Sequence, residues 1–172
     1  MANLHAPFRY DYVGSFLRPE NLKKARANYK AGEISAEELK QVEDEEITKL
    51  VEKQKKAGYS VITDGEFRRS YWHLDFMWGF EGVAHEKEGG GVQFNGEVAD
   101  LEATYLVGKV KAKAHPFVEY FKFLKQFEDD NTVAKYTIPA PAQMYQQMIV
   151  PQNIEQRSEE HTSELQSHSD LV

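Results

Sequence analysis

Polar side chains follow two short hydrophobic segments of this 172-residue chain, and these side chains are the best placed to bind a ligand. Gly14 and Ser15 end the first segment, and Glu66 follows the second. A glycine lets the backbone approach a ligand closely, so the hydroxyl and amide of Ser15 could hold a carboxylate. The Glu66 carboxylate could pair with an ammonium group.

Each of these residues also has a structural explanation. Ser15 could lie in an ordinary turn from strand to loop. Glu66 could be held in a salt bridge by Arg68 or Arg69, since burying an unpaired acid is costly. Asp64 points to the other side of its strand if side chains alternate. We expect Asp64 to accept hydrogen bonds from backbone amides.

A third group of candidates lies in the aromatic segment 67–80, which contains His73 and Asp75. A histidine with a nearby acid can bind a metal or act in acid–base catalysis. A spacing of two residues puts the pair on different helix faces, so we expect structural roles. The chain has no cysteine, which excludes a thiolate metal site and a disulfide framework. It also has no HExxH, phosphate-loop or dinucleotide-binding motif.

The bulk properties narrow the functional class. The formal net charge is −7, and we expect no nucleic-acid partner because no basic patch is evident. No apolar run approaches the roughly 20 residues of a membrane span, so we expect no membrane partner. The first residues lack the apolar core of a signal peptide, and we expect a cytoplasmic protein.

The elements that would position Ser15 and Glu66 alternate between strand and helix. Helices are predicted over 20–30, from the Ser35–Glu38 capping box to Ala57-Gly58, in part of 67–80, and from His115-Pro116 onward. Strands are predicted over 10–16, 59–63, 103–112 and 133–138, with a glycine-containing hairpin or flap over 83–98. This order predicts an α/β architecture, in which ligands bind at the carboxyl ends of parallel strands.

Three motifs together resemble one family. They are YVGSFLRP at 12–19, GEISAEELKQVEDEEI at 32–47 and AGYSVITDGEFRRSYW at 57–72. The chain is similar to the cobalamin-independent methionine synthase family, particularly its short single-barrel members, over residues 8–151. The resemblance implies an incomplete (β/α)8 TIM barrel, with about the first four strands, a hairpin insertion, and residues 1–156 as its N-terminal part. The implied activity transfers a methyl group, classically from a methylated folate, to the thiol of homocysteine.

The resemblance also implies roles for individual residues. Val13, Gly14 and Ser15 match the motif that holds the amino-acid end of homocysteine, and Glu66 matches the residue that binds its amino group. The family's zinc ion makes the substrate sulfur a thiolate, and its ligands come from the later half of the barrel. We therefore assign no metal ligand and no catalytic residue to this chain. Gln146-Gln147 stand where an aromatic platform for the folate would fall, so a different methyl donor stays open.

The last sixteen residues, 157–172 (RSEEHTSELQSHSDLV), resemble the translation of a sequencing-library adapter. We expect a disordered, non-native tail and a natural sequence that ends near Gln156. Half a barrel leaves sheet edges and apolar surface open, so we expect this polypeptide alone to fold poorly and to be inactive. One alternative is a metal-free decarboxylase of the uroporphyrinogen class, in which Arg18, Arg68 and Arg69 would contact substrate carboxylates. The other is a truncated product without activity.

Overall fold

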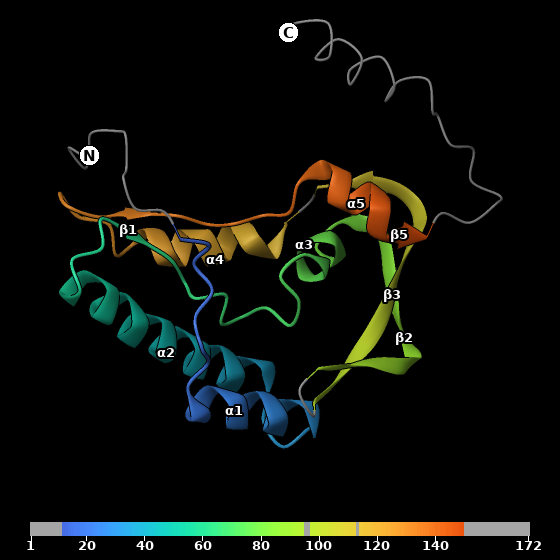
Figure 1. Ribbon diagram of the computed structural model, residues 1–172, viewed down its shortest axis with the longest axis horizontal. Coiled ribbons are helices and arrows are strands. Elements are labelled where there is room, and N and C mark those ends of the chain that lie inside the picture. Colours follow the sequence, from blue (N-terminus) through green and yellow to red (C-terminus); the bar gives the residue numbers. More distant parts are fainter. Residues whose placement is uncertain (1–11, 95–96, 113, 150–172) are drawn as a thin grey trace, which may run out of the picture.

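The computed structural model describes residues 12–94, 97–112 and 114–149, so the expected tail at 157–172 lies outside the described residues. Helices and strands are interspersed along the chain (Figure 1). The helices are α1 (Glu20–Lys30), α2 (Ala36–Lys56), α3 (Leu74–Trp78), α4 (Pro116–Lys125) and α5 (Pro141–Gln147). The strands are β1 (Val61–Ile62), β2 (Glu81–Phe94), β3 (Glu97–Lys111), β4 (Val133–Ala134) and β5 (Met148–Ile149).

Local sequence signals set the ends of the longer helices. The predicted capping box begins α2: the Ser35 hydroxyl accepts from the Glu38 amide at 3.2 Å, and the Glu38 carboxylate accepts from the Ser35 amide at 2.7 Å. The helix ends at Lys56 with Ala57 as its C-cap, at the predicted position. His115 caps α4, because its Nδ1 accepts from the Phe117 amide at 3.2 Å. None of the described helices has the length and apolar character needed to cross a membrane.

Three segments far apart in sequence lie side by side and run in the same direction. β1 pairs with β4 in parallel, with Val61 opposite Val133. On the other side of the same chain segment, Ser15 forms a parallel bridge with Gly65. A first strand was expected over 10–16. In the part of it that the structure describes, from residue 12 onward, the strand pairing seen is this bridge at Ser15. Parallel neighbours joined by helical connections are the arrangement expected for consecutive strands of a barrel.

The strand predicted over 103–112 does not belong to the barrel, so that assignment is wrong. Residues 103–111 lie in β3, which pairs antiparallel with β2 from Glu81–Lys111 to Phe94–Glu97. β4 takes the place beside β1 instead. In Figure 1 the hairpin lies next to α3 and β5, away from β1. A hairpin is present as predicted, but it spans 81–111 rather than 83–98, and the glycines at 89–91 lie within strand β2 instead of between two short segments. Alternating polarity shows that a strand is half-buried, but it does not identify the strand's partner.

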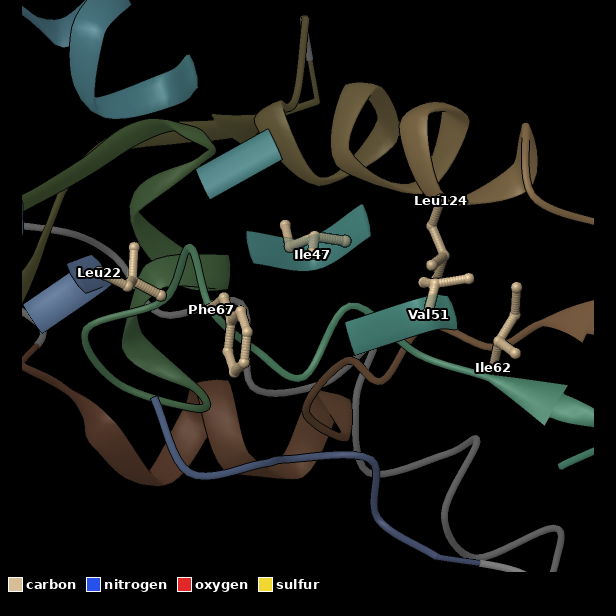
Figure 2. Packing of buried hydrophobic residues seen from close by; sticks show 6 residues of the cluster. All are labelled: Leu22, Ile47, Val51, Ile62, Phe67 and Leu124. Atoms are coloured by element: carbon tan, nitrogen blue, oxygen red, sulfur yellow. The ribbon is translucent and has the colours of Figure 1, made fainter. Parts of the chain in front are cut away.

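The core lies between the helices and the outer face of the parallel strands. Ile47 and Val51 of α2 contact residues from α1, α4, β1 and the following loop (Figure 2). The buried members of this cluster are Leu22, Ile47, Val51, Ile62, Phe67 and Leu124. Ile47 and Val51 thus lie on the face of α2 that is turned to the core. The core cluster supports the strand ends that carry Ser15 and Glu66.

Candidate functional site

The candidate site lies where the three parallel segments end. Ser15 bridges Gly65, and the Phe16 amide donates to the Gly65 carbonyl at 3.1 Å. This puts Ser15 beside the residue that precedes Glu66. Because β4 runs parallel to β1, the residues after β4 reach the same edge. The two positions singled out in the sequence are therefore neighbours in the fold.

Gly14 is required by close packing at this edge. It is buried and has φ +102°, a value that favours glycine. A Cβ at this position would lie 2.5 Å from Cγ2 of Thr63. The Thr63 hydroxyl donates to the Gly14 carbonyl at 2.7 Å. Val13 and Ser15, on either side of Gly14, are exposed, so the Ser15 hydroxyl is accessible to a ligand.

Glu66 is held in an unusual backbone conformation. Its φ of +59° lies in the left-handed region, which costs a non-glycine residue free energy and is concentrated at functional sites. Two contacts hold the backbone there. The Asp64 carboxylate accepts from the Glu66 amide at 2.9 Å, and the Arg18 guanidinium donates to the Glu66 carbonyl at 3.0 Å. The predicted role of Asp64 as an acceptor for backbone amides is confirmed.

The Glu66 side chain is buried and paired. Its Oε1 accepts from Nη1 of Arg69 at 3.2 Å and from the hydroxyl of Thr137 at 3.0 Å. The structural explanation for Glu66, a salt bridge to Arg68 or Arg69, thus holds for Arg69. A paired carboxylate with a second oxygen can still accept a further donor, so the pairing does not exclude a ligand.

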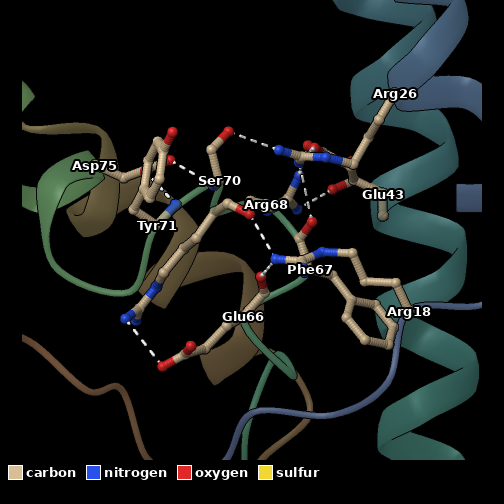
Figure 3. A network of polar contacts seen from close by, with 11 residues as sticks. Arg18, Arg26, Glu43, Glu66, Phe67, Arg68, Ser70, Tyr71 and Asp75 are labelled. Atoms are coloured by element: carbon tan, nitrogen blue, oxygen red, sulfur yellow. Dashed lines mark hydrogen bonds and ion pairs between the residues drawn. The ribbon is translucent and has the colours of Figure 1, made fainter. Parts of the chain in front are cut away.

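Arg68 belongs to a separate buried network that the sequence reasoning missed. Its guanidinium pairs with Glu43 at 3.1 Å and with Asp44, and Arg26 reaches Glu43 at 3.4 Å (Figure 3). Burial raises the pKa of the Glu43 carboxyl, and the charges of Arg68 and Arg26 offset this in part. The signal in the sequence was an acid on the core-facing side of α2, four residues before Ile47. The network ties the loop that carries Glu66 to α2.

The aromatic segment does not supply a site. The Asp75 carboxylate accepts from the amides of Ser70 at 2.8 Å and Tyr71 at 2.7 Å, a structural role as expected. His73 is the residue before α3, and burial lowers the pKa of its imidazole. Within the ranges that the structure describes, no cluster of three or more His, Cys, Asp or Glu could hold a metal ion.

An apolar groove lies on the outer side of β4. Its volume is about 470 Å³. It is lined by aromatic and aliphatic side chains of α3, α4 and residues 134–138, among them Phe76, Phe121 and Ile138. It contains His115, which is occupied by contacts with the Phe76 carbonyl at 2.9 Å and the Phe117 amide. The groove therefore offers packing surface, and two of the rings that line it, Phe117 and Tyr136, also contact the guanidinium of Arg69.

Comparisons with known proteins agree on one family. The family described as "Cobalamin-independent synthase, Catalytic domain" matches residues 10–156. YxjH, an uncharacterized protein of Bacillus subtilis, is 43% identical over 140 residues, which are 81% of this chain and 37% of that protein. A 5-methyltetrahydropteroyltriglutamate–homocysteine methyltransferase of Thermotoga petrophila is 36% identical over 77 residues, 45% of this chain and 10% of that protein.

A solved structure extends this likeness to the fold. It is the crystal structure of a Listeria monocytogenes protein that bears the name vitamin-B12 independent methionine synthase. The identity is 42% and the TM-score 0.70, over 87% of this chain and 41% of that one. The likeness confirms the expected α/β fold, part of a TIM-type barrel. The chain spans about two fifths of the length of the Bacillus and Listeria proteins.

Proposed function

Because the chain belongs to the family of cobalamin-independent synthase catalytic domains, we propose that the strand ends carrying Ser15 and Glu66 bind homocysteine in an S-methyltransferase of methionine biosynthesis. The observation that carries the proposal is the bridge between Ser15 and Gly65. It puts an exposed hydroxyl and the Glu66 carboxylate on adjacent strand ends. One suits the carboxylate of an amino acid, and the other suits its ammonium group.

Each residue has a defined task in this proposal. The hydroxyl and amide of Ser15 donate to the ligand carboxylate, and Gly14 lets the backbone between Val13 and Ser15 come close to it. Glu66 accepts from the ligand ammonium group. Binding both ends fixes the direction in which the sulfur points, and such orientation lowers the barrier to transfer.

The zinc ion and the methylated folate are proposed for a longer protein. The described residues do not fit a zinc site, and the sequence has no cysteine. We assign no residue of this chain to the metal or the methyl donor and derive no step through either. What this chain contributes is recognition of the amino-acid end of the acceptor.

The decarboxylase alternative requires guanidinium groups that face a substrate. Arg68 is paired with Glu43 and Asp44 in the buried network. Arg69 is paired with Glu66, and Arg18 donates to the backbone carbonyls of Glu66 and Arg69. All three arginines serve the structure of the edge. This geometry favours the amino-acid site over a site for several substrate carboxylates.

Replacing Glu66 with Gln tests the proposed site. The measurement uses a barrel chimera, defined as residues 1–149 of this chain followed by the part of YxjH downstream of its matched region. We expect the dissociation constant for homocysteine, measured by calorimetry, to rise roughly tenfold or more, since a charged hydrogen-bond partner is worth about 1.5–3 kcal/mol. Glu119→Gln, which alters an exposed acid on α4, is the matched control. An unchanged dissociation constant for Glu66→Gln would contradict the proposal.

For the 172-residue chain alone, we propose poor folding and no methyltransferase activity. Val13 is 72% exposed, Leu17 97% and Ile138 61%, and the apolar groove beside β4 adds to this surface. Exposed apolar surface and open strand edges favour association. We expect size-exclusion chromatography to show oligomers and calorimetry to show no cooperative transition, whereas the barrel chimera gives both a monomer-sized peak and a transition. A monomeric chain that melts cooperatively or transfers methyl groups would refute this.

A further inference from the structure

Thr137 lies three residues after the end of β4. Its side chain contacts the Glu66 carboxylate, and its backbone contacts Arg69, the arginine that pairs with Glu66. Its hydroxyl donates to Oε1 of Glu66 at 3.0 Å, and its carbonyl accepts from Nη2 of Arg69 at 2.6 Å. Arg69 donates to the same Oε1 through Nη1 at 3.2 Å. We propose that Thr137 and Arg69 are positioning residues that occupy Oε1 and direct Oε2 of Glu66 to the ligand ammonium group. This inference rests on the proposed function.

The distribution of donors over the two carboxylate oxygens carries the argument. Both side-chain donors converge on Oε1. Within the described part of the chain, the structure places no hydrogen-bond donor on Oε2 of Glu66. A carboxylate has about four acceptor positions, so Oε2 keeps its capacity. The carboxylate would therefore meet an ammonium group with one oxygen whose direction is already set.

Arg69 can impose a direction because it is buried and its guanidinium is held by several contacts. Its side chain is 2% exposed. The guanidinium lies 4.7 Å from the ring centre of Phe117 and 4.8 Å from that of Tyr136. Nη1 also donates to the Trp72 carbonyl at 3.3 Å. A planar guanidinium with several donors in fixed positions orients a carboxylate more strictly than a lysine ammonium would.

The backbone of Glu66 is fixed from the opposite side. Asp64 holds its amide and Arg18 holds its carbonyl, so the side chain leaves the loop in one direction. Thr137 then anchors the far end of that side chain. Three strand ends thus cooperate on one residue. A ligand without an ammonium group would give Oε2 no donor, and a polar site built for a donor discriminates against a ligand that lacks it.

The test compares homocysteine with 4-mercaptobutyrate, its analogue without the amino group, in the barrel chimera. Thr137→Val removes the hydroxyl at nearly constant shape, and Thr137→Ser keeps it. We expect Thr137→Val to raise the dissociation constant for homocysteine roughly tenfold, which corresponds to about 1.4 kcal/mol, and to leave that for 4-mercaptobutyrate unchanged. Thr137→Ser restores most of the affinity. If Thr137→Val does not fold by circular dichroism, Thr137→Ala replaces it.

The outcomes separate this inference from the proposed function. If the unsubstituted chimera prefers homocysteine and Thr137→Val keeps that preference, the positioning role is overturned and the site survives. A loss that is equal for both ligands also overturns the positioning role, because it shows a general effect on the pocket. If the unsubstituted chimera binds homocysteine no better than 4-mercaptobutyrate, the proposed recognition by Glu66 fails, and this inference fails with it.

Discussion

Replacing Arg68 with Met in the barrel chimera is expected to lower the free energy of unfolding by about 3–5 kcal/mol at pH 7. The Arg68 side chain is 2% exposed and pairs with Glu43 and Asp44. Its guanidinium also lies 5.1 Å from the ring centres of Tyr120 and Phe123. Methionine fills part of the space but leaves Glu43 without its nearer cation. The expected loss is that of a buried pair from which one partner has been removed.

The pH dependence of this loss follows from the two carboxylates. Burial raises the pKa of Glu43, and Arg68 offsets part of this rise. Without Arg68 the pKa of Glu43 rises further. The ionised Glu43 carboxylate therefore destabilises the variant most at neutral pH. Burial opposes ionisation of Asp44, but hydrogen bonds from Arg68 and Lys40 outweigh it and lower the pKa. The stabilisation from Asp44 is present above its unfolded pKa and is lost as pH falls. The Glu43 effect makes the difference between the proteins shrink as pH falls from about 7 towards 4, and the Asp44 effect makes it shrink further below about pH 4.

Urea unfolding at several pH values measures this prediction. Lys40→Met is the matched control, because Lys40 also pairs with Asp44, at 2.6 Å, but its side chain is 63% exposed. An exposed pair contributes about 0–1 kcal/mol. Equal losses for the two substitutions, or a loss for Arg68→Met that grows at low pH, would show that the network does not stabilise the fold as argued.

Gly65→Ala should be the second most damaging change, with a loss of about 2–4 kcal/mol in the barrel chimera. Gly65 has φ +70°, a conformation that disfavours alanine. The new Cβ would clash with Cδ2 of Leu50 and lie 2.9 Å from the Phe67 ring. Because Glu66 is the next residue, we expect homocysteine affinity to fall as well.

Gly32→Ala separates the two causes in the Gly65 prediction. Gly32 has φ +76°, and a Cβ there would meet nothing within 4 Å. It therefore reports the backbone cost alone, about 1 kcal/mol. Thermal and urea midpoints of both variants give the comparison. A Gly65→Ala variant no less stable than Gly32→Ala would mean that the contacts around Gly65 yield without cost.

Several features of this chain could be predicted from sequence because short-range physics decides them. The α2 capping box needs Ser35 and Glu38 three residues apart, and the structure has it. His115-Pro116 starts α4 for the same kind of local reason. The role of Asp64 as an acceptor depends on an amide two residues away. The three motifs at 12–19, 32–47 and 57–72 also identified the family that the comparisons support.

Other features depend on which segments meet, and only the tertiary structure decided them. The alternating pattern of 103–112 suits a barrel strand and a hairpin strand equally, and its pairing with β2 settled the question. Arg68 and Arg69 were equal candidates for Glu66 in the sequence. Their side chains leave the loop in different directions, so Arg69 contacts Glu66 and Arg68 contacts Glu43. Thr137 lies 71 residues from Glu66 and gave no local signal. Residue types and nearby spacing set what each segment can do, whereas contacts between distant segments arise only when the chain packs.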